Sequence, residues 1–269
     1  MKIFDLYLVS DSTGDTLRKI ARSVLVQFEQ ISAKEHAWPM IRTSKQMDKV
    51  IGSIENNPGV VMYTIVNREN RARLKACCRA LGVPCVPVLS RAITDISNYL
   101  KIEASPVEGK QHGLNDDYFA RIDAMNYTIR HDDGQYAQDL ENADVILVGV
   151  SRTSKSPSCI YLAVRGYKAA NIPFVLNCPL PENLTKLTKP LIIGLTIGEE
   201  RLLEIRKTRL VSISNQDNLS YANEELIREE LTAAKRLFQQ NNWPIIDVSI
   251  RSIEEIVATI IYYYNIRNK

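Results

Sequence analysis

The chain has few cysteines and no long apolar segment. Only five of its 269 residues are cysteine, an odd number without the spacing of metal ligands, so neither a disulfide framework nor a zinc site is predicted. No stretch reaches the roughly 18 apolar residues that a membrane-spanning helix needs. The first residues also lack the apolar core of an export signal. We therefore expect a cytoplasmic protein that does not enter a membrane.

Basic residues are not gathered in one part of the sequence. The formal net charge is +3, and the densest basic segment, 201–209, is mixed with Glu199, Glu200 and Glu204. Proteins that bind nucleic acid usually present a clustered basic face, so no nucleic-acid partner is predicted. Apolar residues make up 45% of the chain, which is enough to fill the cores of two modest domains.

Short apolar runs alternate with segments of helical periodicity in the first hundred residues. The expected strands cover residues 3–9, 60–66 and 83–89, and the expected helices cover 17–28, 69–81 and 91–100. Ser12 and Asp15 have the spacing of a capping box for the first of these helices. Alternation of this kind predicts an α/β fold with a mainly parallel sheet.

A domain boundary is predicted where the hydrophobic pattern is weakest, in residues 103–116. This segment carries the turn formers Pro106, Gly109 and Gly113. The expected N-terminal domain, 1–104, offers surface for docking a partner or for dimerisation, and a second α/β domain covers 105–269.

The second domain repeats the alternation of strands and helices. Its expected strands cover residues 125–130, 144–150, 172–176, 191–197 and 245–248. Its expected helices begin at Pro157, cover 199–210 and 221–240, and end with one that runs toward Tyr264 behind a Ser252–Glu255 capping box. The run 144–150 is almost continuously apolar, which is typical of a strand buried on both faces.

The loop after that strand predicts a phosphate-binding site. Its residues are Gly149, Val150, Ser151, Arg152, Thr153, Ser154, Lys155 and Ser156. Gly149, Lys155 and Ser156 fill the first, seventh and eighth places of the pattern G-x-x-x-x-G-K-[ST]. A glycine lets the backbone turn off the strand so that successive N–H groups face phosphate oxygens. The lysine adds positive charge, and the serine hydroxyl can hold Mg²⁺.

Ser154 departs from this pattern, which has glycine at that place. If the position needs a positive φ, serine is strained there by about 1–2 kcal/mol. The alternative interpretation is a Ser/Thr-rich turn that caps the following helix without binding phosphate. Arg152 could add charge to the site or be a solvated turn residue.

Asp132 and Asp133 are candidates for catalysis. They follow the expected strand 125–130 in a turn that ends at Gly134, where a carboxylate could position or deprotonate a hydroxyl group. The alternative is an Asp-rich β-turn. His131 is a third catalytic candidate because it adjoins Asp132, although a lone histidine is more often structural.

Five further residues are candidates for contacts with the substrate or for a lid. Arg206 and Arg209 have the planar guanidinium groups that suit bidentate contacts with phosphate, or they form a solvated helix face. Ser10 and Asp11 follow the first strand, where α/β sheets often place ligands, or they cap the next helix. His112 lies beside a glycine in a polar segment.

Several separated motifs resemble one known family. The segment Gly-Val-Ser-Arg-Thr-Ser-Lys-Ser-Pro-Ser-Cys-Ile-Tyr-Leu-Ala at 149–163, together with 165–173, 9–17, 112–115 and 127–134, is similar to the pyruvate, phosphate dikinase regulatory proteins. That family also includes regulators of phosphoenolpyruvate synthase. The motifs stand in the family's order and span most of the chain.

The resemblance implies a bifunctional serine/threonine kinase and phosphorylase whose second domain is a P-loop kinase-like α/β domain. The family takes a phosphoryl group from ADP, places it on a threonine in the dikinase active site, and removes it with inorganic phosphate, releasing pyrophosphate. Mg²⁺ as a cofactor and a homodimer are also implied. Ser-Arg-Thr-Ser-Lys is how the dikinase branch reads at the loop, whereas the synthase branch more often has Cys-Gly-Lys.

Three alternatives remain open at this point. The chain could perform the same chemistry on phosphoenolpyruvate synthase. It could be a P-loop kinase of a small metabolite, since the second half alone would suit one. It could also be a nucleotide-sensing module without turnover.

Overall fold

Two parallel four-stranded sheets organise the chain. The computed structural model describes residues 1–104, 116–213 and 219–268. Contacts divide the chain into one unit of residues 1–113 and another of residues 114–269. The boundary predicted after residue 104 lies at the edge of the segment outside the described residues, and His112 lies within that segment.

The first unit carries its strands in the order β2-β1-β3-β4, all parallel. The strands are β1 (Lys2–Ser10), β2 (Ile31–Trp38), β3 (Val60–Thr64) and β4 (Cys85–Pro87). The helices are α1 (Asp15–Leu25), α2 (Ser44–Asn56), α3 (Arg68–Ala80) and α4 (Ser90–Leu100).

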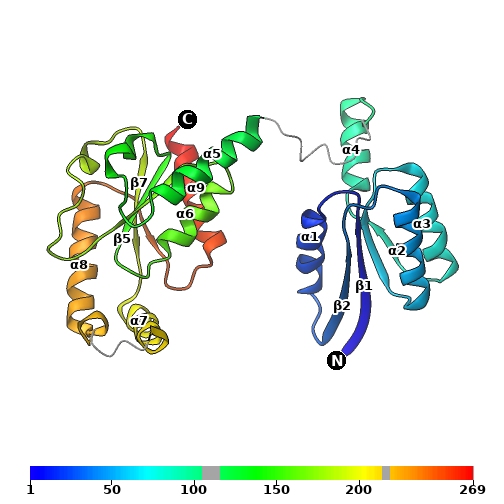
Figure 1. The fold of residues 1–269 in the computed structure, drawn as a ribbon, viewed down its shortest axis with the longest axis horizontal. Helices are drawn as coiled ribbons and strands as arrows, with labels where there is room; N and C mark the ends of the chain where they lie inside the picture. The colour runs from blue at the N-terminus through cyan, green and yellow to red at the C-terminus, as the bar shows by residue number, and fades with distance from the viewer. Residues whose placement is uncertain (105–115, 214–218, 269) are drawn as a thin grey trace. The chain divides into compact units, whose positions relative to one another are not determined.

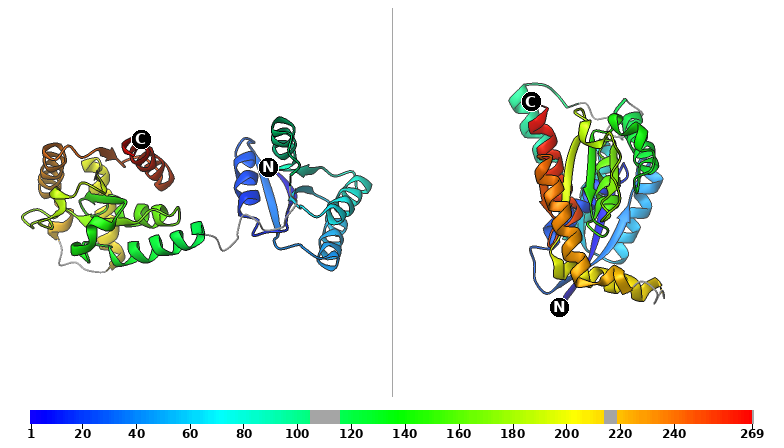
Figure 2. Two further views of the ribbon diagram at one scale, coloured as in Figure 1. Left: turned by 90° about the horizontal axis from the view of Figure 1, so that it is seen from above. Right: turned by 90° about the vertical axis from the view of Figure 1, so that its left-hand side faces the viewer.

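Helices cover both faces of this first sheet. Successive residues of β1 point to opposite faces: Leu6 and Leu8 pack with α1, and Tyr7 and Val9 pack with α2 and α3. Figures 1 and 2 show α1 on one side of the strands and α2 and α3 on the other. Helix α4 buries none of its residues.

The second unit has the strand order β6-β5-β7-β8, again all parallel. Its strands are β5 (Val145–Gly149), β6 (Ala169–Pro173), β7 (Leu191–Thr196) and β8 (Ile245–Asp247). Its α-helices are α5 (Asp116–Arg130), α6 (Lys155–Ala163), α7 (Glu199–Ile213), α8 (Glu224–Gln240) and α9 (Ile253–Arg267). Short 3-10 turns are η2 (Ala137–Asn142), η3 (Leu184–Lys186) and η4 (Leu219–Ala222).

The two sheets have the same topology. In each unit the chain places its second strand on one side of the first strand and then returns to place its third strand on the other side. In α/β sheets, ligands bind outside the carboxyl ends of the strands where this change of direction occurs. In the second unit that place is the end of β5, where the predicted phosphate loop begins.

The predicted α/β class and most of the predicted strands are confirmed, but three local predictions are wrong and two elements were missed. Residues 125–130 form the end of helix α5 and not a strand. Their composition suits a strand, yet Ala124, Tyr127, Thr128 and His131 are the buried positions, and that spacing is helical. The sequence also gave no warning of β2 and α2, which complete the first unit.

The other two errors concern helix starts. Gly14, with φ 81°, stands at the N-cap of α1, which has no side-chain cap, so Ser12 and Asp15 do not form a capping box. Helix α6 starts at Lys155, two residues before Pro157. The predicted Ser252–Glu255 capping box of α9 is confirmed. Within the described segments no helix has both the length and the apolar character to cross a bilayer.

Close packing at Gly194 in β7 yields a stability prediction. A Cβ atom at this position would lie 2.3 Å from Cδ2 of Phe238, a fully buried ring on α8. We predict that Gly194→Ala lowers the free energy of unfolding by about 1–3 kcal/mol, because an overpacked core forces its side chains to shift. Phe238→Leu added to this variant should recover part of the loss. Denaturant unfolding measures both effects.

Gly52 provides the matched control for this prediction. It lies in α2, and a Cβ there would meet no atom within 4 Å. Gly52→Ala should stabilise the protein by about 0.5–1 kcal/mol, because alanine is the better helix former. Equal effects of the two glycine substitutions would contradict the packing argument.

Candidate functional site

The loop of residues 149–156 leaves β5 by a turn that only glycine permits. A Cβ on Gly149 would lie 2.7 Å from the carbonyl oxygen of Leu195 on the neighbouring strand. Two side chains of the loop then bond back to its start: Thr153 Oγ1 and Lys155 Nζ each donate to the carbonyl oxygen of Val150 at 2.9 Å. The loop is therefore closed on itself around a single carbonyl.

Ser154 adopts the conformation that the phosphate-loop pattern reserves for glycine. Its φ is 59°, in the left-handed region, and Arg152 has a φ of 76°. Non-glycine residues in that region cost about 1–2 kcal/mol. The chain thus accepts strain to keep the curve of this loop, and Ser154 ends it as the N-cap of α6.

The main-chain N–H groups of this loop are available to an anion. The N-cap of α6 makes no side-chain hydrogen bond, and no acidic residue lies in the first turn of the helix. Within the described parts of the chain, no acceptor receives a hydrogen bond from the backbone N–H of Ser151, Arg152 or Thr153. Exposed N–H groups at a helix N-terminus form a favourable site for phosphate.

Lys155 places a buried amine beside the start of this loop, where it bonds the Val150 carbonyl. Its side chain is only 6% exposed. Burial lowers the pKa of Lys155 from 10.5 to about 8, and the nearby carboxylates of Asp133 and Asp132 oppose that shift. The amine therefore remains protonated at neutral pH but gains from any additional negative charge.

Three side chains from separate segments meet beside Lys155. Ser156 Oγ donates to Asp132 Oδ1 at 2.8 Å, and Asn171 Nδ2 lies 2.6 Å from the same oxygen. Asn171 Nδ2 also lies 2.8 Å from Ser156 Oγ and 3.3 Å from Asp133 Oδ1. Hence one amide group holds the loop serine and both predicted carboxylates together.

The backbone of Asn171 also fixes the segment that carries the two carboxylates. Its N–H donates to the carbonyl of His131 at 3.0 Å, and its carbonyl accepts from Gly134 N at 2.8 Å. Asp133 and Gly134 have positive φ values of 51° and 77°. The turn that exposes Asp133 is thus attached to β6 at both ends.

A cavity of about 570 Å³ lies over the loop. Asp133 and the loop residues line it on one side, and Ile205 and Arg209 of α7 line it on another. Its volume suits a nucleotide-sized or smaller ligand. Lys155, Ser156, Asp133 and Arg209, all candidates from the sequence, therefore line one cavity.

Arg206 supports the loop from within the protein. Its side chain is 2% exposed, and Nη2 forms an ion pair with Glu230 Oε2 at 2.7 Å. Nη1 donates to the carbonyl of Tyr221 at 3.1 Å, and the guanidinium lies 4.7 Å from the Tyr221 ring centre. Tyr221 Oη in turn lies 3.1 Å from Ser151 Oγ. Arg206 therefore supports the loop from a buried position, whereas the sequence suggested either a lid or a solvated helix face.

His131 lies outside the cavity. Its ring stacks on Tyr127 with centroids 3.8 Å apart, and Nδ1 lies 2.7 Å from the Tyr127 carbonyl oxygen. Its other nitrogen, Nε2, faces Asp139 at 3.6 Å. The side chain packs α5 against η2, so the structure does not bring it to Asp132 or to the loop.

Ser10 and Asp11 join two strands of the first unit. Ser10 Oγ accepts hydrogen bonds from Thr64 Oγ1 at 2.9 Å and from Ser12 N at 3.1 Å. Asp11 Oδ2 accepts from Val66 N at 2.6 Å. Both side chains are buried, and these contacts hold the end of β1 to the end of β3.

Two residues of the site escaped the prediction from sequence. Asn171 had a detectable signal, because a polar residue inside a buried strand must find a hydrogen-bonding partner. Tyr221 had none, since its contacts with Ser151 and Arg152 cross about 70 residues of sequence.

The chain is similar to known proteins over nearly its whole length. Residues 6–261 match a family model described as Kinase/pyrophosphorylase. A relative from Wolbachia pipientis wMel is 49% identical over 268 residues, covering 98% of this chain and 97% of the relative. One from Novosphingobium aromaticivorans is 46% identical over 267 residues, covering 99% and 95%. Both relatives are named, provisionally, pyruvate, phosphate dikinase regulatory protein.

The buried amine yields a prediction for Lys155→Met. A pKa of about 8 instead of 10.5 corresponds to roughly 3 kcal/mol of unfavourable burial at neutral pH, and the hydrogen bond to Val150 offsets about 1 kcal/mol. The free energy of unfolding of the variant at pH 7 should therefore be about 2 kcal/mol higher than that of the wild type. The variant should also not bind inorganic phosphate. Denaturant unfolding and calorimetry measure the two effects.

The pH dependence separates this explanation from a general packing effect. The folded pKa lies below the unfolded one, so the cost of burying Lys155 is complete below pH 8 and disappears as pH rises toward 10.5. The stability advantage of Lys155→Met should shrink over that interval. Lys168→Met, which removes a partly exposed lysine paired with Asp123, is the control and should change stability by less than about 1 kcal/mol. An advantage that does not vary with pH would contradict the argument.

Proposed function

The chain belongs to the kinase/pyrophosphorylase family, and on this premise we propose that it phosphorylates a threonine of pyruvate, phosphate dikinase with ADP and removes the group by phosphorolysis. The family supports phosphoryl transfer as the activity, and the relatives' names support the dikinase as the target. One observation carries the proposal. A loop with left-handed residues, the buried Lys155 and the Asp133 carboxylate line one cavity, and Asp132 accepts a hydrogen bond from Ser156 of that loop.

In the kinase direction the loop would hold the phosphates of ADP. The N–H groups of residues 151–154 and the Lys155 amine would bind the oxygens of the β-phosphate. The threonine oxygen would then attack the β-phosphorus, the bond to the bridging oxygen would break, and AMP would leave. Binding and alignment of this kind supply most of the catalysis in phosphoryl transfer.

In the phosphorylase direction the same groups would hold inorganic phosphate beside the phosphothreonine. An oxygen of inorganic phosphate would attack the phosphothreonine phosphorus, forming pyrophosphate. The threonine oxygen would leave and take up a proton. Both directions thus need one anion site and one group that exchanges a proton with threonine.

The two carboxylates would have different roles. Asp132 is engaged by Ser156 and Asn171, so it would position the loop serine. Asp133 lines the cavity, and its carboxylate would accept the proton of the attacking threonine and return it in the reverse direction. Arg209, which lines the same cavity from α7, would add positive charge toward the phosphates.

Mg²⁺ fits the oxygen atoms at this site. Ser156, Asp132 and Asp133 offer one hydroxyl and two carboxylates, and Oδ1 of Asn171 is buried without a partner among the described residues. Within those residues no group of three or more His, Cys, Asp or Glu side chains is arranged to hold a metal ion. Protein side chains would therefore supply only part of the ligands of Mg²⁺. Mg²⁺ commonly binds through one or two carboxylates plus substrate phosphates. When bound, it would neutralise phosphate charge.

A transfer assay tests the proposed reaction. The purified chain is incubated with ADP labelled at the β-phosphate and with either pyruvate, phosphate dikinase or phosphoenolpyruvate synthase, and the modified residue is mapped. Label on a dikinase threonine is the expected result. Label only on the synthase would change the target, and label only on a metabolite would replace the proposal with a small-molecule kinase. ADP binding without transfer to any acceptor would indicate a sensor.

Asp133→Asn tests the assignment of the base. We predict that it lowers the rate of threonine phosphorylation by about 10²–10⁴-fold, the range typical for loss of general base catalysis, while ADP still binds. Asp123→Asn on α5 is the matched control, because it removes an exposed carboxylate paired with Lys168. Equal rates for the two variants would assign the proton transfer to another group.

A further inference from the structure

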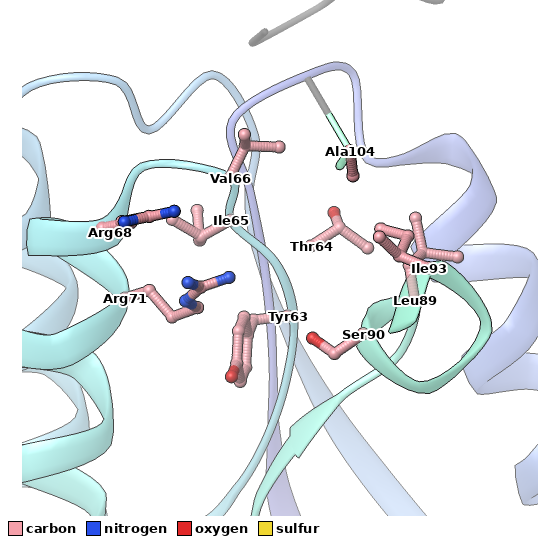
Figure 3. A pocket seen from close by; sticks show the side chains of 10 residues that line it. All are labelled: Tyr63, Thr64, Ile65, Val66, Arg68, Arg71, Leu89, Ser90, Ile93 and Ala104. Carbon is pink, nitrogen blue, oxygen red and sulfur yellow. The ribbon is translucent and has the colours of Figure 1, made fainter. Parts of the chain in front are cut away.

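The first unit contains a pocket that the proposed reaction does not use. It has a volume of about 260 Å³ and lies at the carboxyl end of β3, between the first turns of α3 and α4. Figure 3 shows Arg68 and Arg71 on one side of it and Leu89, Ser90 and Ile93 on the other. We propose that this N-terminal pocket binds a small organic anion, namely a carboxylate or phosphate monoester that carries an apolar group.

The two arginines have no anionic partner among the residues that the structure describes. Within the described residues neither Arg68 nor Arg71 forms an ion pair, and no acidic side chain is among those that line the pocket. Asp11 contacts Val66, which lines the pocket: its carboxylate accepts a hydrogen bond from Val66 N at 2.6 Å. Asp11 itself does not line the pocket. Arg71 is nevertheless half-buried.

The position of the arginines is unfavourable without an anion. Both lie in the first four residues of α3, where the helix dipole is positive and cations are disfavoured. They are three residues apart, so their charges also repel one another on the same helix face. A bound carboxylate or phosphate would relieve both effects and accept bidentate hydrogen bonds from the guanidinium groups.

Helix α4 adds to the positive potential of the pocket. Its N-cap is Leu89, which makes no side-chain cap, and no acidic residue lies in its first turn. The hydroxyl of Ser90 lies at this helix start and makes no hydrogen bond with another described residue, whereas the Ser90 carbonyl accepts one from Thr94 Oγ1. Asn67 caps α3 and Glu69 lies in its first turn, so the positive potential of the pocket comes from the two guanidinium groups and from the uncapped start of α4.

The remaining walls select for an apolar part of the ligand. Ile65, Leu89 and Ile93 provide aliphatic surface, and the Tyr63 ring lies below Arg71. A volume of about 260 Å³ is slightly smaller than the pockets that hold drug-sized ligands. A compact molecule with one anionic group fits these walls better than a nucleotide or a peptide.

The location agrees with the topology of the unit. The sheet order β2-β1-β3-β4 changes direction between β1 and β3, and Tyr63 and Thr64 are the last residues of β3. Parallel sheets bind ligands at such carboxyl ends. The phosphate loop occupies the corresponding edge of the second sheet.

Calorimetry with phenyl phosphate tests the proposal. The full chain carries Lys155→Met, so that the phosphate loop does not contribute, and the result does not depend on phosphoryl transfer. We expect one phenyl phosphate to bind per chain, and its affinity to fall at least tenfold in Arg71→Gln. Arg79→Gln is the matched control: it removes the same charge from the last turn of α3 and should leave the affinity unchanged.

Ile93→Glu provides a second, independent variant. Ile93 is 46% exposed, so a carboxylate there can be tolerated in the fold, and it should weaken binding at least tenfold by repelling the anion. Benzoate in place of phenyl phosphate determines whether the pocket prefers a carboxylate or a phosphate monoester. Absence of binding by both probes, equal binding of neutral phenol, or affinities that neither variant changes would each overturn the proposal.

Discussion

The second unit keeps a charged amine inside a protein core, and the rest of its site follows from that burial. Lys155 is surrounded by the end of β5, the loop and the first turn of α6. Its amine and the Thr153 hydroxyl both donate hydrogen bonds to the carbonyl of Val150. A buried ammonium group is costly unless opposite charge is near. Asp132 and Asp133 meet this requirement only in part, because the pKa of Lys155 is still lowered to about 8. The fold therefore keeps the amine buried at the expense of its stability, as the proposed anion site requires.

Asn171 shows how the fold places the other groups around that amine. It is 1% exposed in β6, and its side chain reaches Ser156, Asp132 and Asp133, which come from two other segments. Its backbone fixes the turn that holds the carboxylates. The strand therefore sets the distance between the loop and the carboxylates, which a flexible connection could not do.

The two units apply the same topology with different chemistry. Each directs the carboxyl ends of its first and third strands toward helix N-termini. In the second unit a glycine-led loop exposes its N–H groups there. In the first unit the end of β1 is instead closed by Ser10 and Asp11, and the open volume lies at β3 beside Arg68 and Arg71. The shared arrangement favours anions at both edges because helix N-termini carry partial positive charge.

The sequence by itself determined the class of fold and located a loop with phosphate-binding spacing between a strand and a helix. Both follow from patterns among residues that are close together in the sequence. These patterns are the apolar run before Gly149 and the spacing of Gly149, Lys155 and Ser156. It failed at residues 125–130, where β-like composition was overridden by packing of one helical face, and at His131, whose side chain packs on Tyr127. Only the tertiary structure decided that Asn171 joins Ser156 to Asp132 and that Arg206 supports the loop through Tyr221. Those contacts cross 15 to 70 residues of sequence. Their partners are determined by how strands and helices pack, which local sequence patterns do not show.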